Sequence, residues 1–285
     1  MSGRIYNPNE ACCSIPPVQS NYKPKGSYQK VGAFDKAYVI GDSKTHALIC
    51  IYDIFGFWPQ TEQGADILSS TLDGTKVVMP DFLKGKPWPV DKFPPKTKEE
   101  KEKLQEFFGT TANPQERLKE TVAVAKSLQG EGYTSIGLYG FCWGGKVAML
   151  AGSHADLFTG ISIVHPAMLD VNDVKGLNVP LAMYPSKDEP ADEVKKIVQA
   201  LKAKPFADQC THKTYPNMLV PSPALTSPVH TPGNEPDTSH FLHTLLVRHH
   251  GWAAARADLT DEENVKAYKD VYACVATFFK GLQKP

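Results

Sequence analysis

The chain has 285 residues, of which 41% are hydrophobic and 22% are charged, so it is long enough to bury a large core. Lysine plus arginine and aspartate plus glutamate both number 31, and this balance favours neither a nucleic-acid partner nor an anionic membrane. The apolar runs are too short to span a bilayer, and the N-terminus lacks the apolar core of a signal peptide. These features predict a cytoplasmic protein, and none of them favours nucleic acid or a membrane over a small molecule as its partner.

Predicted strands and helices alternate along the chain. The predicted strands are residues 36–42, 46–53, 75–81, 134–140, 160–166, 179–186 and 211–216. The predicted helices are residues 62–72, 97–110, 113–129, a helix from Gly144, 191–203 and 261–282, the last with Thr260 as its N-cap. This alternation predicts an α/β fold with a mostly parallel central sheet and helices on both faces. In such folds the functional loops follow the carboxyl ends of the strands.

The six cysteines are expected to be free thiols, because disulfide frameworks are rare in cytosolic chains of this length. Cys50 lies in an apolar predicted strand, and Cys274 lies on the apolar face of the last predicted helix. Both are therefore expected in the core. Only Cys142 has a sequence context that packing does not explain.

Cys142 lies in the stretch GFCWGG, between a predicted strand and a predicted helix. This is the context of a nucleophile elbow, a sharp turn whose neighbours must be small so that the strand and helix can approach. Gly140 and Gly144 meet that need. The N-terminus of the helix would favour a thiolate. The alternative is a glycine-rich turn with an incidental cysteine, and the flanking elements favour the elbow.

A thiol nucleophile needs a base and an orienting acid, which follow it in this topology as acid and then histidine. Asp188 directly follows a predicted strand and is the leading candidate for the acid, with Glu189 in reserve. Asp188 could instead cap the helix that begins near Pro190. Of the nine histidines, His250 precedes the final helix, where the base belongs in this order. His165 ends an earlier strand, close enough to line the pocket.

Several longer stretches resemble the dienelactone hydrolase family of α/β-hydrolases, in its eukaryotic and particularly fungal branch. The matching stretches are ACCS, IYDIFGFWPQTEQGADILS, VVMPDFLKG, GLYGFCWGGK, VHP, SKDEP and HGWAAARADLTDEENVKAY. The resemblance implies an α/β-hydrolase fold and a triad of Cys142, Asp188 and His250. It also implies that the Asp53 carboxylate pairs with the resting thiol.

Further roles are implied for residues around this triad. The oxyanion hole would consist of the backbone N–H groups of Ile54 and Trp143. Arg256 would help to bind an anionic substrate, and His165, Phe55 and Trp252 are further candidates for substrate contact. Trp58 and Trp88 could also line the pocket.

The implied reaction is hydrolysis of a small ester or lactone through a thioacyl enzyme, without a metal ion or an organic cofactor. A thioesterase would use the same three residues, and a non-catalytic small-molecule-binding protein could share the fold. A thiol redox protein is disfavoured, because no second cysteine lies near Cys142 in the sequence.

The predicted domain organisation is an N-terminal extension of residues 1–30 that packs on a single domain of residues 31–285. Residues 219–248, rich in Pro, Ser, Thr and His, interrupt that domain. Long loops of this kind are uncommon inside compact domains. The segment is either a substrate-covering lid or translated sequence from an unremoved intron. We favour the intron, because the flanks PNM and HHGW would join into an uninterrupted family-like stretch.

Overall fold

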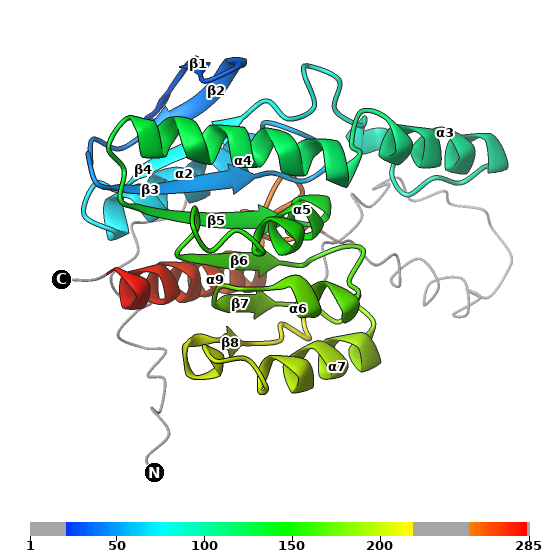
Figure 1. The fold of residues 1–285 in the computed structure, drawn as a ribbon. Helices are drawn as coiled ribbons and strands as arrows, with labels where there is room; N and C mark the ends of the chain where they lie inside the picture. The colour runs from blue at the N-terminus through cyan, green and yellow to red at the C-terminus, as the bar shows by residue number, and fades with distance from the viewer. Residues whose placement is uncertain (1–20, 219–250, 284–285) are drawn as a thin grey trace, which may run out of the picture.

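The computed structural model describes residues 21–218 and 251–283. Within these ranges one sheet has the strand order β1-β2-β4-β3-β5-β6-β7-β8 (Figure 1). Its strands are β1 Ser27–Val31, β2 Phe34–Ile40, β3 His46–Ile51, β4 Lys76–Pro80, β5 Ser135–Phe141, β6 Gly160–Val164, β7 Leu181–Tyr184 and β8 Thr211–His212. β2 pairs antiparallel with β1 and β4, and the other neighbours pair parallel. The mostly parallel sheet is therefore confirmed.

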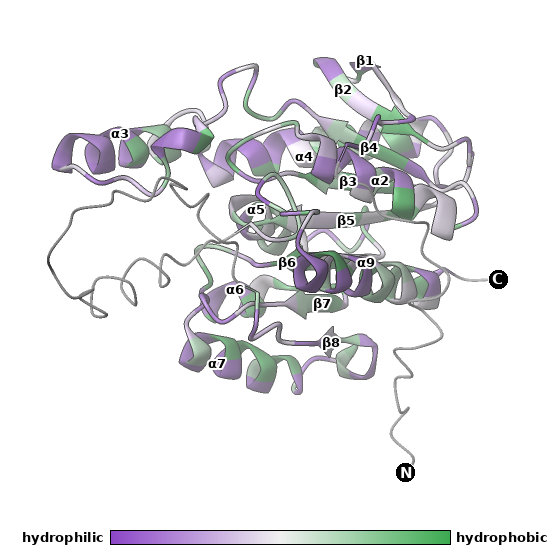
Figure 2. Ribbon diagram, turned by 180° about the vertical axis from the view of Figure 1, so that it is seen from behind, coloured by the Kyte–Doolittle hydropathy of each residue, from purple (hydrophilic) through white to green (hydrophobic). Residues whose placement is uncertain are grey.

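Helices cover both faces of this sheet. The helices are α2 Pro59–Thr71, α3 Lys98–Gly109, α4 Pro114–Gly130, α5 Trp143–Ala151, α6 Asn172–Gly176, α7 Ala191–Leu201 and α9 Glu262–Leu282, with short 3-10 turns η1 Val90–Lys92 and η2 Ala207–Gln209. Figure 1 shows α4, α5, α6 and α7 in front of the sheet, and Figure 2 shows α2 and α9 on its opposite face. Among the described residues, no helix is both long and apolar enough to cross a membrane.

The strands in the middle of the sheet are apolar along almost their whole length, and the sequence predicted them for that reason. In β3, the run Ala47–Ile51 is buried throughout, as parallel strands covered on both faces must be. Cys50 is fully buried there, and burial raises the pKa of its thiol far above the usual range. Cys274 is also buried, on α9. The predicted burial of both cysteines in the core is confirmed.

Three elements differ from the sequence prediction. β1 lies inside the segment that was assigned to an N-terminal extension, and its residues are mostly exposed, so no apolar pattern marks it. β8 forms over only two of the six predicted residues, although an isolated bridge between Ser186 and Tyr215 continues the pairing. The short helix α6 was not predicted. The domain boundaries at residues 30 and 31 stay a prediction.

The N-cap of the last helix was predicted one residue too early. The Asp261 side chain caps α9 by accepting a hydrogen bond from the N–H of Asn264, at 2.7 Å. The hydroxyl of Thr260 instead donates to the Asp258 carboxylate, at 2.6 Å. Aspartate and threonine are both good N-cap residues, so local sequence alone did not separate the two positions.

Carboxylates of α2 fix the first described residues to the sheet. The buried Asp66 carboxylate accepts hydrogen bonds from the hydroxyls of Tyr22 and Tyr38, at 2.6 and 2.5 Å, and from the N–H of Lys25, at 2.8 Å. The neighbouring Glu62, one turn earlier, accepts a hydrogen bond from the hydroxyl of Tyr28. Two acidic groups therefore lie close together in a largely buried site.

Replacing Glu62 by glutamine is expected to stabilise the protein at alkaline pH. Burial raises the pKa of Glu62 and Asp66 raises it further, while Tyr28 and Lys36 act in the opposite direction. Because its folded-state pKa is raised, the stability that Glu62 contributes is present at low pH and is lost as the pH rises through that pKa. We therefore expect Glu62→Gln to raise the melting temperature by about 2–3 °C near pH 8.

The same comparison near pH 4 is the test of this cause. There the wild-type carboxyl is protonated, so the gain should shrink towards zero. Glu102→Gln, on the exposed surface of α3, is the control and should show no gain at either pH. A gain of equal size at both pH values would contradict the electrostatic explanation.

Candidate active site

Cys142 lies at a strained turn between β5 and α5. Its backbone has φ 54° and ψ −120°, a region that residues other than glycine rarely adopt. A Cβ atom on Gly140 would lie 2.2 Å from the carbonyl oxygen of Gly144, and one on Gly144 would lie 2.2 Å from that of Ile51. The prediction that these flanks must be small is therefore confirmed. The turn has the geometry of a nucleophile elbow.

Backbone hydrogen bonds hold the turn from the side of β6. The N–H of Cys142 donates to Val164, at 3.2 Å, and its carbonyl accepts from Ala167, at 2.9 Å, and from Gly145, at 3.0 Å. Cys142 is 9% exposed, so the residue is largely enclosed. The thiol is thus held in one place at the N-terminus of α5, where the helix dipole favours negative charge.

The two predicted oxyanion donors follow adjacent strands. β3 pairs with β5 in a register that sets Ile51 opposite Gly140, so the loops that follow these strands begin side by side. Ile54 belongs to the first loop, and Trp143 is the first residue of α5. The N–H groups of a first helical turn have no partner inside the helix. The Trp143 indole donates to the carbonyl of Ala112, at 2.7 Å, which fixes the residue in the core. The oxyanion role of both N–H groups stays a prediction.

Asp53 connects the loop after β3 to the segment before α9. Its carboxylate is buried and accepts hydrogen bonds from the N–H of Phe55, at 2.9 Å, and from that of Ala255, at 3.2 Å. These contacts bring the run of alanines near residue 255 to the carboxyl end of the sheet. Pairing of Asp53 with the Cys142 thiol stays a prediction.

Arg256 brings a cation to the predicted site. Burial lowers the pKa of Arg256, and the charges of Asp53, Cys142 and Asp188 act in the opposite direction. Its guanidinium carbon lies 5.9 Å from the ring centre of Phe55 and 5.4 Å from that of Phe93. Sequence reasoning missed Phe93, since its position in a proline-rich loop carries no local sign of this contact.

Asp188 lies in a tight turn after β7. The hydroxyl of Ser186 donates to the Glu189 carboxylate, at 3.0 Å, and accepts a hydrogen bond from the N–H of Asp188, at 3.3 Å. Both carboxylate oxygens of Asp188 are shielded from solvent. Pro190, not Asp188, is the N-cap residue of α7, and the alternative role of Asp188 in capping this helix stays a prediction. Glu189, the reserve acid, closes the turn itself.

The predicted base, His250, lies outside the described residues, as does the interruption at 219–248. The description resumes at Gly251, whose φ of 115° is a conformation that glycine adopts easily. Trp252 is fully buried, its carbonyl accepts a hydrogen bond from the Asn264 side chain, at 2.8 Å, and its ring packs on Tyr215. The start of this segment is therefore anchored to α9 and to the end of the sheet.

The remaining candidates divide into buried and partly exposed side chains. His165 is completely buried, and its ring lies 5.6 Å from that of Phe141 and 6.1 Å from that of Trp252. These rings form a packed layer beside the elbow. Trp58 and Trp88 are partly exposed and hydrogen-bond to the carbonyls of Phe55 and Ile54, so both border the loop after β3. Substrate contact by any of these residues stays a prediction.

A mostly parallel sheet with a strained cysteine turn between a central strand and a helix defines the α/β-hydrolase class. The model of the Dienelactone hydrolase family matches residues 36–218, and the chain belongs to this family. This confirms the resemblance drawn from the sequence. The match to the family model ends at residue 218, directly before the segment 219–248 that interrupts the domain.

Two relatives and one solved structure agree with this assignment. An uncharacterized AIM2 family protein of Schizosaccharomyces pombe is 35% identical over 249 residues, which cover 86% of each chain. A carboxymethylenebutenolidase homolog of Xenopus tropicalis is 32% identical over 68% of this chain and 78% of its own. A putative dienelactone hydrolase of Klebsiella pneumoniae covers 90% of this chain and 98% of its own, with a TM-score of 0.61. At 14% identity, this last match supports the fold alone.

Proposed function

We propose that the protein is a cysteine-dependent hydrolase of a small ester or lactone. The observation that carries this proposal is the position of Cys142, at a strained strand-to-helix turn whose flanking glycines allow no larger side chain. Asp188 follows another parallel strand of the same sheet and shares with Cys142 the electrostatic environment of Arg256. His250 completes the proposed triad.

The proposed reaction proceeds through a thioester. His250, oriented by Asp188, takes the proton of Cys142, and the sulfur attacks the carbonyl carbon of the substrate. The N–H groups of Ile54 and Trp143 stabilise the oxyanion, and each such donor typically contributes about 10²–10³ in rate. The ester C–O bond then breaks, and the leaving oxygen takes the proton from His250. Water, deprotonated by His250, attacks the thioester carbonyl, which releases the acid and restores the thiol.

Arg256 supports a substrate that carries a carboxylate near the scissile bond. A guanidinium binds a carboxylate in a bidentate manner. The guanidinium of Arg256 lies against the aromatic rings of Phe55 and Phe93, which hold it in place. We therefore expect Arg256→Met to lower kcat/KM for a carboxylate-bearing lactone about 30- to 100-fold.

The control for this prediction is a neutral ester. The same variant should hydrolyse p-nitrophenyl acetate within about threefold of the wild-type rate, because this substrate has no carboxylate for Arg256 to bind. An equal loss on the charged and the neutral substrate would show that Arg256 acts on the catalytic groups or on folding. It would then not be a substrate-binding residue.

The proposal is tested by trapping the acyl enzyme. Rapid mixing with p-nitrophenyl acetate should give a burst of nitrophenol, and intact mass spectrometry should find one acetyl group. Peptide mapping should place that group on Cys142. The same assay on a dienelactone and on an acyl thioester separates an esterase from a thioesterase.

A variant that lacks residues 219–248 tests the interruption of the domain. Hydrolytic activity kept or raised in this variant would mean that the segment is dispensable. Loss of hydrolytic activity in a variant that still folds would support a lid. If both the wild-type protein and this variant fold but show neither a burst nor turnover on p-nitrophenyl acetate, the dienelactone or the acyl thioester, a binding role is favoured and the proposed hydrolase function is overturned.

A further inference from the structure

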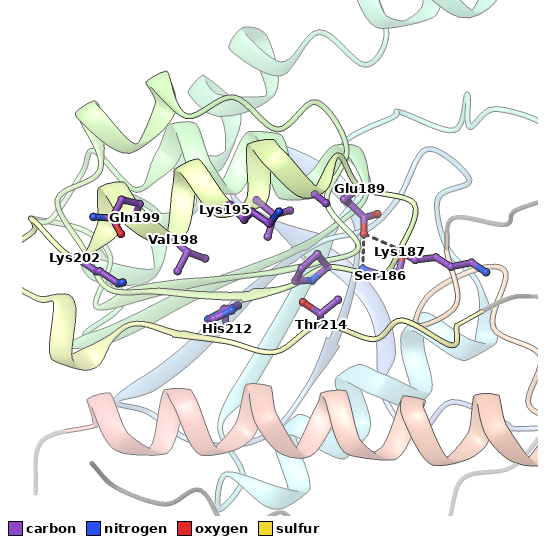
Figure 3. Close-up of a pocket in the computed structure, with 12 residues that line it drawn as sticks. Ser186, Lys187, Glu189, Lys195, Val198, Gln199, Lys202, His212 and Thr214 are labelled. Atoms are coloured by element: carbon purple, nitrogen blue, oxygen red, sulfur yellow. Dashed lines mark hydrogen bonds between the residues drawn. The ribbon is translucent and has the colours of Figure 1, made fainter. Parts of the chain in front are cut away.

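A cavity lies between helix α7 and the edge strand β8, and Cys142 is not among the residues that line it. Its volume is about 580 Å³, which lies within the range of small-molecule sites. Figure 3 shows the side chains of α7 on one side of it and those of His212 and Thr214 on the other. The residues that line it include Ala191, Val194, Lys195, Val198, Lys202 and His212. None of these residues belongs to the proposed triad.

The α7 wall of this cavity combines apolar and cationic side chains. Val194 and Val198 are one turn apart, and both lie partly buried against the core. Lys195 and Lys202, the latter being the C-cap residue of the helix, are seven positions apart, and both line the cavity together with the valines. His212 adds an imidazole ring from β8. The cavity therefore offers an apolar surface bordered by positive charge.

The acidic groups near this cavity do not cancel its charge. Glu189 is the one carboxylate in the lining, and it accepts hydrogen bonds from the N–H and the hydroxyl of Ser186. Lys195 lies 3.5 Å from Asp192, but both side chains are highly exposed, and such pairs are weak. Among the described residues, no carboxylate lies within ion-pair distance of Lys202. A negatively charged ligand would therefore be favoured.

We propose that this cavity binds an amphipathic monoanion, namely a carboxylate that carries an unbranched apolar chain. The chain would lie on Val194 and Val198, and the carboxylate would lie between Lys195, Lys202 and His212. The turn of Ser186 and Glu189 forms the end wall of the cavity and also carries Asp188. A bound ligand would thus contact the turn that positions the proposed catalytic acid.

The test is a titration of the full chain with sodium octanoate, followed by NMR of labelled valine methyl groups. Saturable shifts are expected at the methyl groups of Val194 and Val198. Acetate lacks the chain and 1-octanol lacks the charge, so each should bind at least about fivefold more weakly. The octanoate affinity should also fall with rising salt, because exposed charges are screened.

Two matched double variants decide the role of the lysines. Lys195→Gln with Lys202→Gln should weaken octanoate binding about five- to tenfold, since two exposed ion contacts are lost. Lys126→Gln with Lys196→Gln removes the same charge from exposed positions outside the cavity and should change the affinity by less than about twofold.

The Arg256→Met variant separates this cavity from the proposed active site. Octanoate shifts at Val194 and Val198 should persist in it, whatever becomes of hydrolysis. Octanoate shifts confined to other valines, equal affinity in both lysine variants, or acetate binding as tight as octanoate would each overturn the proposal. A protein without hydrolase activity that still binds octanoate here would leave this site standing and overturn only the proposed function.

Discussion

Replacing Cys142 by alanine is expected to lower kcat/KM for p-nitrophenyl acetate by at least about 10³-fold. The sulfur is the atom that would form the thioester, and the proposed oxyanion donors cannot replace a nucleophile. Alanine keeps the Cβ atom, and with it the backbone at φ 54°. The loss should therefore appear in activity and not in the melting temperature.

The control for this variant is a second cysteine outside the site. Cys210 is partly exposed just before β8, and its sulfur lies 3.4 Å from the N–H of Leu181 and 3.6 Å from the carbonyl of Phe206. Cys210→Ser should keep the wild-type rate and the wild-type sensitivity to iodoacetamide. Undiminished hydrolysis by Cys142→Ala would remove the basis of the proposed mechanism.

Replacing Gly144 by alanine is expected to lower the free energy of unfolding by about 3–5 kcal/mol. The added Cβ atom would lie 2.2 Å from the carbonyl oxygen of Ile51 and 2.6 Å from that of Tyr52. Both oxygens belong to the main chain at the end of β3, between β4 and β5 in the sheet. Backbone cannot move aside there without disturbing several strands, so the strain is expected to appear as lost stability. Urea denaturation followed by circular dichroism measures it.

Gly130→Ala is the matched control, because a Cβ atom at that helix end meets nothing within 4 Å. Alanine is the better helix former, so this change should leave stability equal or raise it by up to about 1 kcal/mol. A Gly144→Ala protein as stable as the wild type would mean that α5 can shift away from β3. The tight approach of helix and strand would then not explain the glycine.

The elements that the sequence predicted well are those whose own pattern carries the signal. β3 and β5 are apolar and buried along almost their whole length, and α9 keeps an apolar face over six turns. β1 and β8 are exposed edge strands: β1 was not predicted as a strand, and β8 forms over only two of the six residues predicted for it. Their strand state depends on hydrogen bonds to β2 and β7, which a local pattern does not encode.

The candidate site divides in the same way. The turn at Cys142 was predicted because Gly140, Gly144 and the flanking strand and helix are its neighbours in sequence. The close approach of strand and helix at this turn explains both glycines. Asp188 was proposed as the acid because it follows a recognisable strand, and the structure places it in a turn after β7. The contact of Arg256 with Phe93 and the hydrogen bond from Ala255 to Asp53 join residues far apart in the chain.

The sequence by itself therefore determined the alternation of strands and helices, the place of the thiol, and the acid turn at a strand end. These features depend on backbone conformation and burial, which side chains a few residues apart control. Only the tertiary structure decided that Arg256 lies within electrostatic reach of Asp53, Cys142 and Asp188, and that valines and lysines on one side of α7 border a cavity beside β8. Such groupings form when distant segments pack together, because the register and twist of the sheet set which loops meet.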